Sequence, residues 1–89
     1  MPLVVFTNNL KRHIECPAET VEGKTIREVL DKVFENNKKL ATYVLDDQGR
    51  LRQHMLILLD GVAIKDKSTL SDPVQKESEV YVLQALSGG

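Results

Sequence analysis

One segment of this chain carries an unambiguous helical pattern, and the stretches on either side of it are patterned like strands. Thr25 and Glu28 have the spacing of a capping box, in which two side chains satisfy backbone N–H groups at a helix N-terminus. Apolar residues then recur at three- and four-residue intervals: Ile26, Val29, Leu30, Val33 and Phe34. The spacing predicts a helix over residues 26–37 that packs this apolar stripe on a sheet.

Two strand-like segments come before the helix. Leu3–Thr7 is apolar and β-rich, and after the Asn8-Asn9 break an extended stretch runs through His13–Cys16 towards Glu19–Val21. Pro17 has no N–H to donate to a sheet, so we expect the second strand to be bulged or to lie at the sheet edge there. The pair predicts an opening hairpin.

Further strands follow the helix. The almost continuously apolar run His54–Leu59 ends at Asp60-Gly61, a pair that predicts a hairpin to Val62–Ile64. Glu79–Ala85 is predicted to be the last strand. The apolar segment Leu40–Leu45 between helix and strands has no single expected state.

The predicted order of elements is ββαβββ. It indicates an α+β fold in which a mixed sheet of four to five strands packs on one main helix. A hairpin, a helix across the sheet and a last strand beside the first make the β-grasp arrangement, and a split βαβ sandwich is the alternative. We expect a β-grasp domain over residues 1–86 and a flexible tail over residues 87–89.

Composition excludes several classes of function. The 12 Lys and Arg against 13 Asp and Glu provide no basic field, and four aromatic residues offer few platforms for stacking bases, so nucleic acid is not an expected partner. No apolar run reaches the ~20 residues that span a bilayer, and the N-terminus lacks the order of a secretion signal. We therefore expect no membrane contact and a cytoplasmic location, which also suits the single cysteine, Cys16.

Residues that could carry chemistry are scattered. Cys16 has no paired cysteine or glycine-rich loop, so packing is favoured over a nucleophilic or redox role. His13 and His54 have no ligand spacing, so no metal site is predicted. Asp46-Asp47 fits a solvated turn better than an acid–base pair, and Lys65-Asp66-Lys67 fits a loop better than a phosphate site. No catalytic residues are predicted, and the chain is not expected to be an enzyme.

Strand alternation predicts an exposed apolar cluster. If Ile57 and Val82 face the helix, their neighbours point to the other side of the sheet. That side then carries four large apolar side chains: Leu56, Leu58, Tyr81 and Leu83. A cluster of this kind predicts a partner-docking surface, to which we add Leu86, whereas a one-residue register shift would bury these side chains instead.

The sequence ends in Gly88-Gly89, directly after Leu86-Ser87. Because glycine has no Cβ, this pair can pass through a narrow channel and bring its carboxylate against a nucleotide. The free end is therefore the candidate reactive group.

The order of elements, the Leu58-Leu59-Asp60-Gly61 hairpin, the Leu70–Ser78 turn and the Ala85–Gly89 end resemble those of the MoaD/ThiS family of ubiquitin-like sulfur carriers. The resemblance covers essentially the whole chain. The Asp46–Leu59 segment is more similar to carriers that serve cysteine or specialised-metabolite pathways than to the shortest thiamine carriers.

The resemblance implies a mechanism and a set of partners. An E1-like enzyme, using ATP and Mg²⁺, would convert the Gly89 carboxylate to an acyl-adenylate, and a sulfur donor would displace AMP to leave a thiocarboxylate. A downstream enzyme would accept the sulfur for molybdopterin, cysteine, thiamine or a specialised metabolite. No cofactor is expected to be bound stably. The alternatives are a protein modifier that forms isopeptide bonds through Gly89, and a β-grasp interaction domain with an incidental tail.

Overall fold

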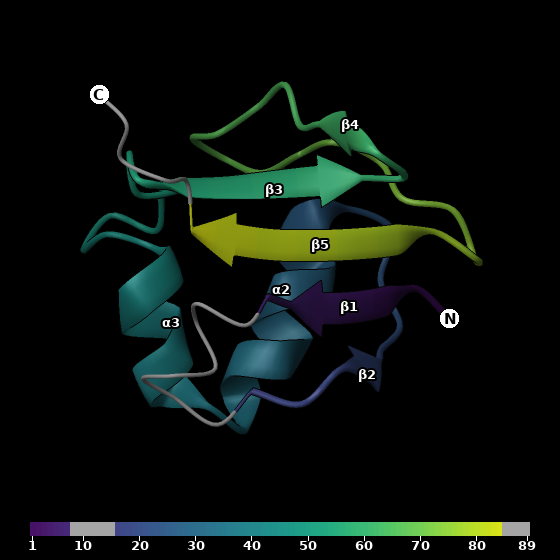
Figure 1. Ribbon diagram of the computed structural model, residues 1–89, viewed down its shortest axis with the longest axis horizontal. Coiled ribbons are helices and arrows are strands. Elements are labelled where there is room, and N and C mark those ends of the chain that lie inside the picture. Colours follow the sequence, from purple (N-terminus) through teal and green to yellow (C-terminus); the bar gives the residue numbers. More distant parts are fainter. Residues whose placement is uncertain (8–15, 85–89) are drawn as a thin grey trace.

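A five-stranded sheet and two helices make up the part of the chain that the computed structural model describes, residues 1–7 and 16–84 (Figure 1). The strands are β1 (Leu3–Phe6), β2 (Glu19–Thr20), β3 (Met55–Leu59), β4 (Val62–Ala63) and β5 (Glu79–Gln84). The helices are α2 (Ile26–Glu35) and α3 (Lys38–Val44). Helix α2 crosses behind the sheet in Figure 1, and the opposite face of the sheet is turned towards the viewer.

The strand order in the sheet is β2-β1-β5-β3-β4. The last strand, β5, lies parallel to the first and between β1 and β3, while the other neighbouring strands are antiparallel. This is the β-grasp arrangement, so the predicted fold class is confirmed and the split βαβ alternative is not the fold.

The core lies between the sheet and α2. The apolar stripe predicted for the helix is buried, with Phe34 the most exposed of its five side chains at 6%. Opposite it, the inward residues of the three central strands are equally buried: Val4, Phe6, Ile57, Val80 and Val82. The alternation that was used to orient β3 and β5 is therefore the observed one.

Helix α2 begins where the capping pattern predicts. The Thr25 side chain accepts a hydrogen bond from the Glu28 N–H at 3.2 Å, and the Glu28 carboxylate accepts one from the Lys24 N–H. The helix ends at Glu35, two residues before the predicted boundary.

A second helix, α3, follows at once and was not predicted. The Asn37 side chain begins it by accepting a hydrogen bond from the Leu40 N–H at 3.3 Å. Seven residues make only two turns. Since only Leu40 and Val44 of these are buried, the segment carries too little periodicity for its sequence to indicate a helix.

The second strand is shorter than predicted. Only Glu19 and Thr20 pair with β1, and residues 16–18 around Pro17 form no strand, since proline cannot donate to a ladder. Cys16 is buried as part of the core, and its packing role stays a prediction. The rest of the expected strand, residues 13–15, lies outside the described residues.

Gly23 lies where the chain passes closely over α2. A Cβ atom at this position would be 2.8 Å from Val29 Cγ2 and 2.9 Å from Val29 N. We expect Gly23→Ala to lower the free energy of unfolding by about 1–3 kcal/mol, the usual cost of overpacking. Urea denaturation measures this, and adding Val29→Ala should make the two changes cost less than their sum, whereas additive costs would contradict the contact.

Candidate functional site

The side of the sheet that faces away from α2 carries the predicted apolar cluster. Leu56 lies opposite Leu83, and Leu58 lies opposite Tyr81, in the antiparallel pair of β3 and β5. Tyr81 is 37% exposed, and the three leucines are partly exposed. The structure therefore brings four of the predicted docking residues together on one face, and the shifted register is not observed.

Strand β1 extends this cluster, which the sequence reasoning missed. Val5 lies opposite Tyr81 in the parallel pair of β1 and β5. Val5 and Leu3 are partly exposed because they alternate with the buried Val4 and Phe6. The same alternation applied to Leu3–Phe6 is the signal that could have found them.

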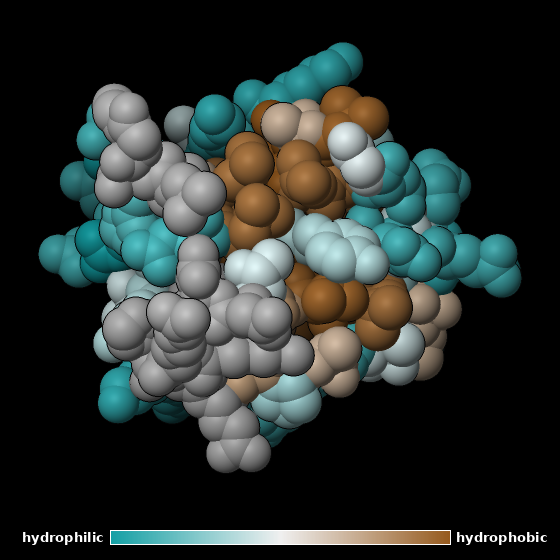
Figure 2. Space-filling model, viewed as in Figure 1, coloured by the Kyte–Doolittle hydropathy of each residue, from teal (hydrophilic) through white to brown (hydrophobic). Residues whose placement is uncertain are grey.

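We call this surface the outer face. It consists of six apolar residues on three strands: Leu3, Val5, Leu56, Leu58, Tyr81 and Leu83. Figure 2 shows the hydrophobic surface gathered near the middle of this side of the molecule, with hydrophilic side chains around much of its edge. Such a contiguous apolar area on a small domain is typical of an interaction site.

The outer face lies on the strand that leads to the candidate reactive end. The described chain stops at Gln84, the last residue of β5, which lies opposite Met55. Leu86, Gly88 and Gly89 lie outside the described residues. Gly89 is six positions beyond Leu83 in the sequence, and six residues of extended chain span about 22 Å at most.

The two residues of the Asp46-Asp47 pair have different surroundings. The Asp46 carboxylate accepts hydrogen bonds from the N–H groups of Arg50 and Gln48, at 3.0 and 2.8 Å, and pairs with the Arg50 guanidinium at 3.3 Å. The Arg50 backbone N–H is the chief cause that lowers the pKa of Asp46 below its usual value. Asp47 is exposed. The observed turn is the solvated turn that was predicted.

The Lys65-Asp66-Lys67 segment is a loop, and its one carboxylate, that of Asp66, accepts hydrogen bonds from the residues that follow it in this loop. The Asp66 carboxylate accepts hydrogen bonds from the hydroxyls and N–H groups of Thr69 and Ser71, and from the Ser68 N–H. These bonds, those of the Ser71 and Thr69 hydroxyls foremost, hold the pKa of Asp66 far below its usual range. The carboxylate therefore has a structural role in this loop.

This lowered pKa predicts how stability depends on pH. Because the folded state favours the charged form of Asp66, its contribution is fully present above the unfolded pKa of about 3.9 and is lost as the pH falls through the lower folded value. We expect Asp66→Asn to remove that part of the acid destabilisation between about pH 5 and pH 2. Ser71→Ala, which removes one donor, should give an intermediate dependence in urea denaturation. Parallel profiles for all three proteins would contradict this role.

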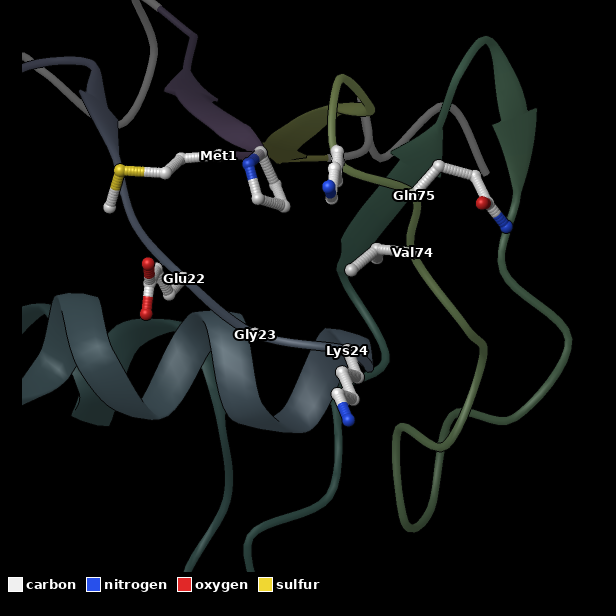
Figure 3. A pocket seen from close by; sticks show the side chains of 8 residues that line it. Met1, Glu22, Gly23, Lys24, Val74 and Gln75 are labelled. Carbon is white, nitrogen blue, oxygen red and sulfur yellow. The ribbon is translucent and has the colours of Figure 1, made fainter.

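A hollow of about 400 Å³ lies near the N-terminus, between residues 1–2, 22–24 and 74–76 (Figure 3). Val74 is buried, whereas Glu22 and Lys24 are exposed and lie on different sides of the hollow rather than converging on one point. Leu3, next to this hollow in sequence, pairs with Glu79 at the start of β5, at the other end of that strand from Gln84. The hollow therefore lies near the end of the sheet where β5 begins, opposite the end where Gln84 lies.

Within residues 1–7 and 16–84, no group of three or more His, Cys, Asp and Glu side chains could hold a metal ion. Neither helix in that part of the chain is long and apolar enough to cross a membrane.

Comparisons with known proteins agree with this geometry. The sequence matches the ThiS family over residues 8–89. A comparison with curated proteins gave no match. Among solved structures, a chain of the Amycolatopsis orientalis BexX/CysO complex has a TM-score of 0.82 at 17% identity, and 100% of each chain is covered. SAMP1 from Haloferax volcanii has a TM-score of 0.77 at 22% identity, covering 99% of this chain and 98% of its own.

Urm1 from Sulfolobus solfataricus has a TM-score of 0.66 at 20% identity, with 93% of this chain and 99% of its own covered. At these identities the structural matches show the fold alone, and they agree on the β-grasp. The family match extends over nearly the whole sequence and includes Gly88 and Gly89. This chain belongs to the ThiS family, whose members are ubiquitin-like sulfur carriers.

Proposed function

We propose that this chain is a sulfur carrier whose Gly89 carboxylate is activated by an E1-like enzyme and converted to a thiocarboxylate. A downstream enzyme then takes the sulfur for a sulfur-containing cofactor or metabolite, with molybdopterin, cysteine, thiamine and a specialised metabolite as the candidate products. The observation that carries the proposal is the ThiS family match, because it runs through the terminal glycines. In this reaction the chain is a protein co-substrate, and a cytoplasmic location suits its need for ATP.

The chemistry needs few groups from the carrier. A Gly89 carboxylate oxygen attacks the α-phosphate of Mg²⁺-bound ATP, and pyrophosphate leaves. Sulfide then attacks the acyl carbon and AMP leaves, which gives the thiocarboxylate directly. Where the donor is a persulfide, the product is an acyl disulfide, and a thiol cleaves it to release the thiocarboxylate while the thiol and the donor are joined in a disulfide. A carboxylate is a poor acyl donor at neutral pH, so the adenylate supplies the leaving group that the exchange requires. ATP and Mg²⁺ belong to the partner.

The outer face supports this proposal by its position. Tyr81 and Leu83 lie on the strand that continues to the tail, and Leu58 and Leu56 pair with them. A partner that binds this face holds the carrier close to the reacting end, and such positioning converts a bimolecular reaction into an effectively unimolecular one. We assign the outer face, together with Leu86, to docking of the adenylating enzyme.

A protein modifier is the second candidate function. It is favoured by the similarity to SAMP1, a small archaeal modifier protein. In that case a lysine amine of another protein attacks activated Gly89 and forms an isopeptide bond. A β-grasp interaction domain with an incidental tail is the third candidate.

The intact mass of the chain recovered from its native cell separates these functions. We expect a fraction in which one oxygen is replaced by sulfur, with tandem mass spectrometry placing the sulfur on Gly89. Proteins that carry branched Gly-Gly remnants on lysine, with no thiocarboxylate, would support the modifier. An unmodified Gly89 under sulfur demand, with no remnants, would support the interaction domain.

A further inference from the structure

The turn that joins β3 to β4 consists of Asp60 and Gly61, and both residues have left-handed backbone conformations, with φ of 51° and 85°. Two central residues with positive φ are typical of the type I′ hairpin turn, for which Asp-Gly is a preferred pair. This is the only place in the sequence where glycine follows aspartate or asparagine. Both residues are exposed, and a Cβ atom built on Gly61 would meet no described atom within 4 Å. No described group therefore crowds the turn on that side of Gly61.

An aspartate that precedes glycine can rearrange spontaneously. The backbone nitrogen of Gly61 attacks Cγ of Asp60, a C–N bond forms, and one carboxyl oxygen leaves as water, which gives a five-membered succinimide. Water then opens the ring. Hydrolysis at Cγ restores aspartate, whereas hydrolysis at the backbone carbonyl gives isoaspartate, in which the main chain runs through Cβ and Cγ. Glycine permits the attack because it carries no Cβ beside the nitrogen. One water leaves and one enters, so no other reactant is needed.

Two hydrogen bonds hold the Asp60 carboxylate on the side of β5. Oδ1 accepts one from the Glu79 N–H at 2.8 Å, and Oδ2 accepts one from the Ser78 hydroxyl at 2.9 Å. The Asp60 N–H donates to the Glu79 carbonyl at 2.9 Å, so the backbone of Asp60 is held there as well. Strand β3 lies between β5 and β4 (Figure 1). The carboxylate is therefore bound to β5, while Gly61 leads the chain to β4 on the other side.

The Ser78 hydroxyl is itself fixed by the surrounding chain. Ser78 is 3% exposed. Its hydroxyl oxygen accepts a hydrogen bond from the Gln75 N–H at 2.8 Å while its proton is donated to Asp60. The Ser78 carbonyl accepts a hydrogen bond from the Leu3 N–H at 2.9 Å, and the Ser78 N–H donates to the Gln75 carbonyl at 3.2 Å. Because these bonds join Ser78 to β1 and to the preceding turn, the hydroxyl keeps its position beside Asp60.

Ring closure requires Cγ of Asp60 to come within bonding distance of the Gly61 nitrogen, and a rotation of the carboxylate away from β5 breaks both of its hydrogen bonds. We infer that Asp60-Gly61 is a latent site of isoaspartate formation, and that the Ser78 hydroxyl and the Glu79 N–H suppress this reaction in the folded chain. Isoaspartate adds a backbone atom to the two-residue turn and takes Cγ into the main chain. Its formation therefore removes the contact between this carboxylate and Ser78.

Warming of the full chain at neutral pH, with peptide mapping at intervals, tests this inference. An endoprotease that cleaves before aspartate but not before isoaspartate reports conversion as an uncut Leu59-Asp60 bond, and the succinimide has the mass of the chain less one water. We expect Ser78→Ala to convert about tenfold faster than the wild type, the change that loss of one hydrogen bond to a charged group produces in an equilibrium. In urea, where the fold is absent, both proteins should convert at the same rate.

Two variants separate this effect from general destabilisation. Gly23→Ala is expected to lower the free energy of unfolding while it leaves the partners of Asp60 in place, so its rate in native buffer should stay near that of the wild type. Ser71→Ala removes a serine hydroxyl that binds a different carboxylate, that of Asp66, and should also convert like the wild type.

Equal rates for Ser78→Ala and the wild type in native buffer would overturn the protective role of Ser78. An acceleration in Gly23→Ala as large as that in Ser78→Ala would do the same, because the conversion would then follow unfolding. An Asp60 that stays unconverted in urea would overturn the site itself. None of these measurements involves Gly89, so their outcome is independent of the proposed sulfur chemistry.

Discussion

Tyr81→Glu is expected to lower kcat/KM for adenylation of this carrier by about 30-fold or more, while the domain stays folded. Tyr81 lies at the centre of the outer face, with Leu58 and Val5 on either side, and is 37% exposed. Aromatic residues at the centre of an interface commonly contribute 2 kcal/mol or more to binding, which is about 30-fold in affinity. A buried carboxylate adds a desolvation cost. The rate of pyrophosphate release with the adenylating enzyme measures the effect.

The control for this prediction is Tyr43→Glu. Tyr43 lies on α3 and is 38% exposed, so the same chemical change is made at a similarly exposed tyrosine away from the outer face. We expect its kcat/KM to remain within about twofold of the wild type. Thermal unfolding of both variants confirms that they are folded. Equal losses in the two folded variants would show that the enzyme does not bind the outer face.

The face on which each strand residue lies could be predicted from local sequence. In Met55–Leu59 and Glu79–Gln84, alternate residues were expected to face the apolar stripe of the helix. Ile57 and Val82 were assigned to that inward side correctly. Once the inward residues are known, their neighbours Leu58 and Tyr81 must point to the opposite side of the sheet. The direct pairing of these two residues is a matter of register between distant segments and was supplied by the structure.

Features that depend on how the backbone folds, rather than on periodicity, were missed. Val5 joins the outer face only because β1 lies parallel to β5. In this pairing Val4 lies opposite Val80, which is 76 positions later in the sequence. Gly23 is needed because the chain passes over Val29, which no local pattern indicates. The Asp66 carboxylate has no partner in its nearest neighbours and gains its role from how residues 68–71 fold around it. Sequence periodicity carries none of this information.

The terminal glycines rest on a different kind of argument. Gly88 and Gly89 lie outside the described residues, so their proposed role depends on the family match and on the chemistry of a free carboxylate. Docking at the outer face and reaction at Gly89 are also separable steps. A change on the face should weaken binding, whereas a change at the end should leave binding largely intact and stop the chemistry.

Deletion of Gly89, or its replacement in Gly89→Val, is therefore expected to reduce thiocarboxylate formation by at least about 100-fold, the loss that a misplacement of about 1 Å can cause at a reacting centre. Deletion moves the carboxylate back by one residue, and valine adds a branched Cβ to a segment that must pass through a narrow channel. The free energy of unfolding should not change, since both changes lie beyond β5.

Ser87→Ala keeps both glycines and is the matched control, for which we expect nearly wild-type conversion to the thiocarboxylate. Intact-mass spectrometry after incubation with the adenylating enzyme, ATP and a sulfur donor measures the converted fraction. A stable Gly89→Val protein that transfers sulfur at the wild-type rate would refute the role of this residue. If Ser87→Ala lost as much thiocarboxylate formation as Gly89→Val, the tail would act through its sequence as a whole rather than through its terminal carboxylate.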